Sequence, residues 1–311
     1  MLSDINIKDQ NSDQLLDERT IPVSLLAKKS SGVLRRRKIK NFVSWVIFGS
    51  FFILIIAPLI WLLYGVFKAA FSNWSFSVLF HPTAGNAGGI SNAIVGTLYI
   101  IVGVGLLAGV FGVSIGIYLS EYAGPLFKKI VGTSADILSG VPSILFGFVG
   151  YELLVLKFGW GMSSAAAIIV LSVMVLPYVA KSTETALSKI PTSYREGAKA
   201  IGLNKSQTVF KVVIRQGLPM ILNGLIIAIA IAIGETAPML YTAGWVDGYP
   251  KYLQFTHAPL PYLTYLVWTD YNQPFKSAKI LSNDAALAIL VIVGLLFLSA
   301  KLIVRVMKSY D

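Results

Sequence analysis

The sequence predicts an all-α integral membrane protein with six transmembrane helices. Three observations support this: of 311 residues, 55% are hydrophobic and only 13% are charged, and the mean hydropathy is +0.71. A soluble domain carries roughly 25% charged residues. The hydrophobic runs also lack the polar–apolar alternation of barrel strands, so helices are expected and a β-barrel is not.

Six stretches are long enough to cross the membrane, because a helix needs about 20 mostly apolar residues to span roughly 30 Å of hydrocarbon. They are flanked by Gly, Pro, Asn and basic residues, which are common at helix ends. The predicted spans are residues 41–67, 92–119, 131–156, 162–180, 218–241 and 284–306.

The first span is preceded by a polar segment of a different character. Residues 1–20 are polar and acidic, and a basic cluster at Arg35, Arg36, Arg37, Lys38 and Lys40 leads into the membrane. A secretory signal has a shorter apolar core nearer the start of the chain. We therefore predict a largely disordered cytoplasmic tail over 1–40 and an uncleaved anchor over 41–67.

The distribution of basic residues predicts the orientation of the chain. Of the 26 Lys and Arg, 21 lie in the N-terminal segment, the loops around 120–130 and 181–217, and the C-terminal end, whereas five lie on the other side. The positive-inside rule places the richer side, with both termini, in the cytoplasm. Basic residues scattered between membrane crossings favour contact with membrane lipid and do not indicate a nucleic-acid partner.

Several classes of chemistry have no support in the sequence. The chain has no cysteine, and its two histidines, His81 and His257, lie far apart without a nearby carboxylate cluster, so no metal site is expected. The Gly202–Ser206 segment only echoes the end of a phosphate-binding loop, with Asn in place of the required Gly. We expect no catalytic residue and no cofactor in this chain.

Two features inside the predicted spans are candidates for function. The Gly140–Ser143 segment contains Pro142 and interrupts helical hydrogen bonding, either as a simple kink or as a pivot. Glu235 is a carboxylate at membrane depth, where it is costly. It is explained either by a hydrogen bond or ion pair to another helix or subunit, or by a role as a gate in a translocation path.

The longest cytoplasmic loop, 181–217, contains a candidate docking helix. We expect Pro191 to separate two short helical segments, with Thr192 or Ser193 capping the second. Small residues at Ala198, Ala200 and Gly202 make this helix thin enough to sit in a groove of a partner. The alternative is an amphipathic helix lying on anionic lipid.

The same loop resembles the EAA motif of ABC-transporter permeases. It reads Glu196-Gly197-Ala198, then three residues and Gly202, with Leu218-Pro219 afterwards; the motif expects Ala where Gly197 stands. Further matches to the PstA-type permeases of phosphate-specific ABC importers cover about residue 88 to the C-terminus. They include Gly88 to Thr97, Leu119 to Ala123, Asp136 to Ile144, Leu176-Pro177 and Gly234 to Pro238.

This resemblance implies a type I, MetI-like permease domain over 88–308. It implies that Tyr194, Arg195, Glu196, Gly197, Ala198 and Gly202 contact an ATPase, and that Pro142, Ser143, Glu235, Thr236 and Pro238 belong to a translocation path or gate. The implied partners are a second, PstC-like permease, two PstB-like subunits that bind and hydrolyse ATP, and an extracytoplasmic phosphate-binding protein. That protein would dock near a short outer helix after Leu260-Pro261, in the aromatic loop 242–283.

Because of one departure from the family pattern, the sequence is compatible with more than one transported anion. Members commonly carry an Arg one turn before the glutamate of the fifth span, and here that position is Ile231. A permease for molybdate, tungstate or sulfate therefore remains an alternative. A self-sufficient ion-coupled carrier is a further alternative, although no internal repeat supports it.

Overall fold

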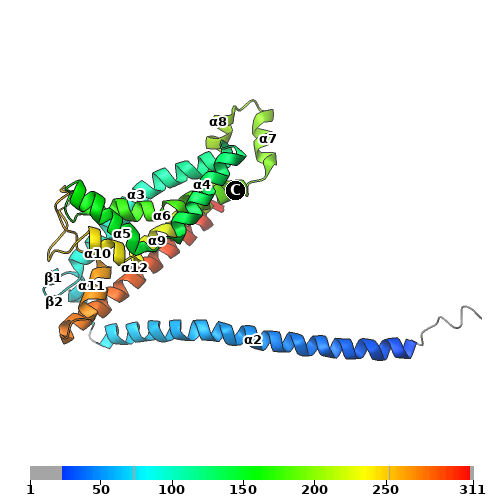
Figure 1. Cartoon of the computed structure of the whole chain (residues 1–311), viewed down its shortest axis with the longest axis horizontal. Coiled ribbons are helices and arrows are strands. Elements are labelled where there is room, and N and C mark those ends of the chain that lie inside the picture. The colour runs from blue at the N-terminus through cyan, green and yellow to red at the C-terminus, as the bar shows by residue number, and fades with distance from the viewer. Residues whose placement is uncertain (1–22, 73, 252, 309–311) are drawn as a thin grey trace, which may run out of the picture. The chain divides into compact units, whose positions relative to one another are not determined.

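The computed structural model describes residues 23–72, 74–251 and 253–308. The chain divides into two compact units, one ending at Gly65 and the other beginning at Val66, and each is described by itself. Figure 1 labels the elements within both units.

The described part of the first unit is one helix, α2 (Val23–Ser72), which continues into the second unit. It contains the predicted anchor but begins well before it and includes the basic cluster. Residues 23–40 belong to this helix, in which Arg and Lys are good helix formers; residues 1–22 of the predicted tail lie outside the described part. At 1.5 Å per residue α2 is about 75 Å long, so part of it must extend beyond the hydrocarbon.

The second unit is a bundle of helices with one small hairpin, β1 (Thr83–Ala84) paired with β2 (Ala87–Gly88) in antiparallel register. Within the described residues its helices are η1 (Phe76–Leu79), α3 (Ser91–Glu121), α4 (Pro125–Gly140), α5 (Ser143–Gly150), η2 (Tyr151–Lys157), α6 (Ser164–Ser188), α7 (Thr192–Ala200), α8 (Lys205–Thr208), η3 (Val209–Val213), α9 (Ile214–Gly234), α10 (Ala237–Thr242), α11 (Leu263–Tyr271) and α12 (Lys276–Lys308).

The centre of the bundle is formed by α3, α6 and α9. Glycines on α3 allow α6 to approach closely: a Cβ at Gly112 would lie 2.7 Å from Val179 Cβ, and one at Gly116 would lie 2.5 Å from Thr183 Cβ. Small residues on one face of α3 thus let the two helices lie in close contact. Around this contact lies a buried apolar cluster that includes Val104, Leu171, Val175, Ala228 and Met239.

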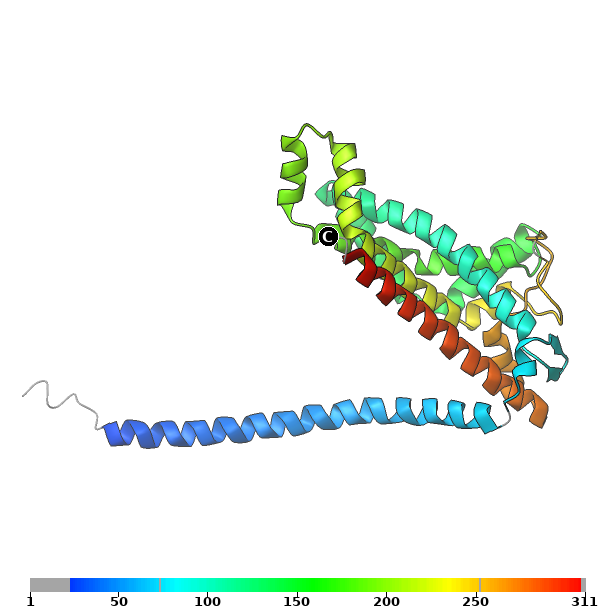
Figure 2. The same cartoon turned by 180° about the vertical axis from the view of Figure 1, so that it is seen from behind.

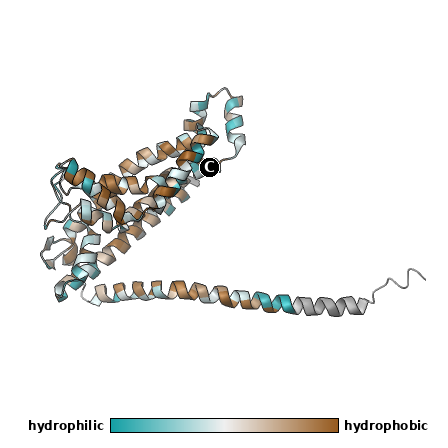
Figure 3. Ribbon diagram, viewed as in Figure 1, coloured by the Kyte–Doolittle hydropathy of each residue, from teal (hydrophilic) through white to brown (hydrophobic). Residues whose placement is uncertain are grey.

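The membrane spans agree with the prediction in number, with one qualification. In the described part of the chain, five helices are long and apolar enough to cross, namely α2, α3, α6, the run from α8 to α9, and α12; a sixth crossing exists if α4 and α5–η2 count together. Figure 3 shows the hydrophobic residues along these helices and the hydrophilic ones on α7.

The third predicted span, 131–156, is not one straight helix. Its two halves meet at an angle of 94°, with Val141 in an extended conformation (φ −73°, ψ 128°). Proline disfavours the α conformation in the residue before it and lacks the N–H that would continue the ladder. Pro142 therefore ends α4 and starts α5 in a new direction.

The fifth predicted span, 218–241, is also interrupted, which the sequence prediction missed. The helix α9 ends at Gly234, Glu235 is extended (φ −74°, ψ 128°), and α10 begins at Ala237 with Pro238 in its first turn. Proline is favoured there because the first turn of a helix needs no internal N–H donor. The other spans differ in their ends: α6 runs on to Ser188, and α12 starts at Lys276.

The two ends of the second unit are built from different elements. Figures 1 and 2 show β1–β2 and α11 at one end and the α7–α8 hairpin with the C-terminal part of α12 at the other. The first end includes the aromatic loop, in which Trp245 stacks on Tyr265 with ring centroids 4.4 Å apart. The short helix predicted after Leu260-Pro261 is confirmed as α11.

Candidate functional site

The two helix breaks lie on elements that pack against each other. On α5, a Cβ at Gly147 would lie 2.7 Å from the Cα of Pro238 on α10, and one at Gly150 would lie 3.2 Å from Thr242. Gly147 thus allows the backbone of α10 to approach α5, whereas Gly150 makes room for the side chains of Thr242 and of Val170 on α6. Of the residues predicted for a path, Pro238 lies at this contact, and Thr236 lines a hollow with Ile144, which directly follows Pro142 and Ser143 in the chain.

Glu235 occupies the break itself and not the middle of a helix. Its side chain is half-buried, and its backbone carbonyl accepts a 3.2 Å hydrogen bond from Thr264 Oγ1 on α11. Among the described residues no ion pair involves this carboxylate. The residue lines a very small cavity with Thr97, Tyr262 and Thr264, in which the buried Tyr262 hydroxyl has no hydrogen-bond partner.

A larger hollow of about 480 Å³ lies beside the same break. Thr236 and Ala237 from the start of α10 line it, together with Ile144, Leu240, Tyr241 and Trp268. Ile144 follows the other break directly, so the hollow is bounded by both. The residues that line it and the smaller cavity include hydroxyl groups, and none of them is Lys or Arg.

An apolar side chain occupies the position at which the related permeases commonly carry an arginine. Ile231 is half-buried and packs against the apolar cluster between α3, α6 and α9. This part of the chain therefore offers hydroxyl groups and a carboxylate, which bind an oxyanion only with help from a cation or a proton.

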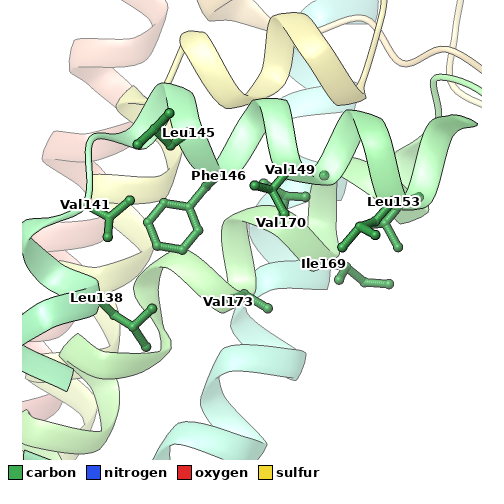
Figure 4. Close-up of a pocket in the computed structure, with 11 residues that line it drawn as sticks. Leu138, Val141, Leu145, Phe146, Val149, Leu153, Ile169, Val170 and Val173 are labelled. Atoms are coloured by element: carbon green, nitrogen blue, oxygen red, sulfur yellow. The ribbon is translucent and has the colours of Figure 1, made fainter. Parts of the chain in front are cut away.

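Another pocket, of about 340 Å³, is apolar throughout. Figure 4 shows its lining, which comes from α4, α5, η2 and α6: Leu138, Val141, Leu145, Phe146, Val149, Gly150, Leu153, Leu154, Ile169, Val170 and Val173. Such a lining suits an apolar side chain or an acyl chain and gives no polar group to a charged substrate.

The coupling helix predicted in the 181–217 loop is α7. It begins at Thr192 after Pro191, and neither Thr192 nor Ser193 caps it, because Pro191 occupies the cap position. Its end is a Schellman motif: Gly202 (φ +83°) donates its N–H to Lys199, and Leu203 donates to Ala198. The glycine of the EAA-like motif is thereby explained by its left-handed backbone.

A tight turn joins α7 to α8. Asn204 and Gln207 form a capping box, in which each side chain accepts a hydrogen bond from the backbone N–H of the other residue, at 2.8 and 3.0 Å. We call residues 192–208 the coupling hairpin. Its outer face exposes Tyr194, Glu196, Gly197 and Ile201, while Ala198 is buried.

Arg195 behaves differently from its neighbours on α7. Its side chain points into the molecule, where Nη2 lies 2.6 Å from Glu121 Oε1 and Nε lies 3.2 Å from Glu121 Oε2. It also donates to the carbonyls of Ile190 (2.9 Å) and Leu187 (3.1 Å). Of the six residues predicted to contact an ATPase, Tyr194, Glu196, Gly197 and Gly202 are exposed, whereas Ala198 and Arg195 face inward.

Glu121 is a functional candidate that the sequence analysis did not single out. It is the last residue of α3, and its side chain is only 8% exposed. The signal available in the sequence was an acidic residue at the end of a predicted span, but nothing in the sequence links it to Arg195. In the part of the chain that the structure describes, no three His, Asp or Glu side chains form a group able to hold a metal ion.

Comparison with known proteins assigns these features to a family. Residues 112–309 match the family described as binding-protein-dependent transport system inner membrane component. The phosphate transport system permease protein PstA 2 of Mycobacterium bovis is 46% identical over 92% of this chain and 94% of its own length. The phosphate transport system permease protein PstA 1 of Mycobacterium tuberculosis is 30% identical over 86% and 90%, respectively.

Solved structures show a similar fold. A chain of the MetNI methionine ABC transporter, in an inward-facing conformation, superposes with a TM-score of 0.58 at 22% identity, covering 70% of this chain and 95% of that one. A chain of a bacterial ABC transporter that imports alginate gives 0.51 at 15% identity, covering 91% and 99%. These two likenesses concern the fold alone.

Proposed function

Because the chain belongs to the binding-protein-dependent transport system inner-membrane components, and among them to the PstA-type permeases, we propose that it is the transmembrane permease subunit of an ATP-driven importer of inorganic phosphate. The choice of phosphate as the substrate rests on the 46% identity to a phosphate permease over nearly the whole of both chains. The family and the fold expected from the sequence are thereby confirmed.

The energy for transport comes from other subunits in this proposal. Two PstB-like subunits bind and hydrolyse ATP, and they hold the exposed face of the coupling hairpin, including Tyr194, Glu196 and Gly197. A second, PstC-like permease completes the path, and an extracytoplasmic phosphate-binding protein delivers the anion. This chain itself binds no cofactor and catalyses no reaction.

The translocation path runs along the two helix breaks. Thr236 and Pro238 meet α5 there, and the hollow of about 480 Å³ offers room for a hydrated anion. Since no Lys or Arg lines this region, the PstC-like permease supplies the positive charge that phosphate requires. Pro142 and Ser143 place α5 in this path by turning the chain through 94°.

The chain is a multi-pass membrane protein, and we place both termini in the cytoplasm. The end of the second unit that holds the coupling hairpin carries Lys189, Lys199, Lys205 and Lys211, in agreement with the excess of basic residues on one side. The coupling hairpin must lie on the same side as ATP, which supports this orientation independently of charge.

The proposal is tested by a double substitution on the coupling hairpin, Glu196→Arg with Gly197→Trp, since an added side chain at Gly197 meets nothing within 4 Å in this chain. Both positions are exposed, so the bulky and oppositely charged side chains obstruct a partner without filling the core. In the reconstituted complex we expect loss of phosphate-stimulated ATP hydrolysis, measured with the binding protein present. Hydrolysis at the wild-type rate would refute the coupling assignment, and Lys181→Gln on α6 serves as an exposed control.

A further inference from the structure

The C-terminal end of α3, residues 120–122, receives three basic side chains from three different elements. Arg195 of α7 binds the Glu121 carboxylate through two nitrogens. Lys205 of α8 lies 4.8 Å from the centre of the Tyr122 ring, and Lys128 of α4 donates to the Ser120 carbonyl at 3.3 Å. Cations are favourable at a helix C-terminus because of its partial negative charge, and here both arms of the coupling hairpin supply one.

The Arg195–Glu121 contact is the strongest of these ties by its geometry. Two parallel N–H···O bonds of 2.6 and 3.2 Å make it a bidentate pair, which fixes orientation as well as distance. The side chain of Glu121 is 8% exposed and that of Arg195 is 23% exposed, so water competes little for either. For comparison, Lys181 and Glu184 on α6 meet at 3.8 Å, with Lys181 55% exposed.

Arg195 also binds the end of α6. Its Nη1 and Nη2 donate to the carbonyls of Ile190 and Leu187, which follow or lie in the last turn of that helix. The Leu187 carbonyl also accepts the Ile190 N–H at 3.2 Å, so the guanidinium adds to the hydrogen bonds that close the end of α6. One side chain of the coupling helix therefore holds the cytoplasmic ends of two membrane-spanning helices together.

These two helices are packed so closely that they must move together. A Cβ at Gly116 would lie 2.6 Å from the Ala180 carbonyl and 2.5 Å from Thr183 Cβ, and one at Gly112 would meet Val179 at 2.7 Å. Interiors packed at this density transmit displacement without absorbing it. A movement imposed on the end of α3 is thus passed to the helices that surround the candidate path.

We propose that the Arg195–Glu121 pair is the link through which a displacement of the coupling helix reaches α3 and α6. This inference rests on the proposed function. It adds Arg195 as a positioning residue and Glu121 as the residue of α3 to which Arg195 passes the displacement. The outer face of α7 contacts the ATPase, and its inner face, through Arg195, moves the membrane helices. Without the pair, the ATPase still binds and hydrolyses ATP, but hydrolysis no longer drives the anion across.

The test uses Arg195→Lys and Glu121→Gln in the full reconstituted complex. The lysine keeps the charge but cannot make a bidentate contact, and the glutamine keeps the shape but loses the charge. We expect both variants to retain the ATPase subunits in wild-type ratio and to hydrolyse ATP. We expect phosphate uptake per ATP hydrolysed to fall at least about tenfold, with Glu184→Gln as a control that leaves this ratio unchanged.

A second variant separates a mechanical link from a general loss of structure. The chain contains no cysteine, so Glu121→Cys with Arg195→Cys introduces its only thiols. In a complex whose other subunits lack cysteine, uptake per ATP should be low before treatment. It should recover once a bis-maleimide spans the two positions and replaces the ion pair by a covalent link.

Two outcomes would overturn the inference. One is that hydrolysis and uptake fall in the same proportion in Arg195→Lys and Glu121→Gln, or that neither falls. The other is that cross-linking leaves uptake per ATP at its untreated level. If the wild-type complex itself takes up no phosphate with ATP and the binding protein, the proposed function fails instead, and the two failures are thereby distinguished.

Discussion

At the scale of single residues, the coupling helix depends on a backbone conformation that favours glycine. Gly202 has φ +83° and closes the Schellman motif that ends α7. A side chain at such a position costs about 1–2 kcal/mol, since the Cβ crowds the following carbonyl. The motif glycine is thus required by the chain itself, before any partner binds.

We predict that Gly202→Ala loosens the end of α7. A cost of about 1 kcal/mol raises the open population about fivefold, so the amides of residues 198–203 should exchange with deuterium about fivefold faster. Hydrogen exchange followed by mass spectrometry measures this directly. Unchanged exchange would show that the left-handed turn is not what the glycine provides.

Gly197→Ala is the matched control on the same helix, and it has the opposite expectation. An added Cβ at Gly197 meets nothing within 4 Å, and its backbone is helical. Ala is about 1 kcal/mol more favourable than Gly inside a helix. Exchange over α7 should therefore slow, and a faster rate would contradict this account of the helix.

Asp270 on α11 is a second residue whose environment has a measurable consequence. It is 5% exposed, and its Oδ2 has no hydrogen-bond partner among the described residues. Burial, together with the charge of Asp247, raises the pKa of this carboxyl to about 6 from an ordinary value of 3.8. The ionised form therefore costs stability at neutral pH.

We predict that Asp270 makes the protein less stable as the pH rises. With a raised folded-state pKa, its favourable contribution is complete below pH 3.8 and is lost as the pH rises through about 6. The melting midpoint in detergent should thus drop between about pH 5 and about pH 7.5, and Asp270→Asn should reduce that drop. An equal drop in the variant would assign the pH dependence to other groups.

At the scale of elements, the contact between α5 and α10 holds the two helix breaks together. We predict that Gly147→Ala disturbs it, since the new Cβ would lie 2.7 Å from the Pro238 backbone. Overpacking of this kind costs about 1–3 kcal/mol, which lowers the melting midpoint by about 2–4 °C per kcal/mol. Phosphate uptake should fall with it.

Gly140→Ala controls for the loss of a glycine in the same broken span. A Cβ at Gly140 meets nothing within 4 Å, so neither the melting midpoint nor uptake should fall. If the two substitutions behave alike, the close packing of α5 on α10 is not the feature that matters.

The sequence predicted the helices better than their interruptions. Hydropathy identified every span, and Pro142 indicated the first break, because proline acts on its own neighbours in the chain. The 94° angle was not predictable from neighbouring residues, since α5 packs on α10, a segment about 90 residues away, where Gly147 meets the Pro238 backbone. The second break was missed because the apolar run continues past Glu235 and conceals the change in backbone.

The Arg195–Glu121 pair shows the same limit at the candidate site. The two residues lie 74 positions apart, and no periodicity in the sequence connects them. The exposed face of α7 was predictable from a local motif, whereas the inward role of Arg195 became visible only once α3, α6 and α7 were placed around it.

At the scale of the whole molecule, the orientation in the membrane is open to a direct test. Leu253 is 95% exposed in the aromatic loop, and Ile201 is 78% exposed on the coupling hairpin. The chain has no cysteine of its own. In spheroplasts, a membrane-impermeant maleimide should label Leu253→Cys directly and Ile201→Cys only after permeabilisation. The reverse pattern would place the termini outside.

We propose that this chain takes part in phosphate import with the energy of ATP supplied by other subunits. The decisive experiment is uptake of labelled phosphate into proteoliposomes that contain the complete complex, with ATP inside and the binding protein outside. We predict uptake that requires hydrolysable ATP and is suppressed by unlabelled phosphate but not by sulfate, molybdate or tungstate. Uptake without the ATPase subunits, or suppression by one of the other oxyanions in place of phosphate, would contradict the account.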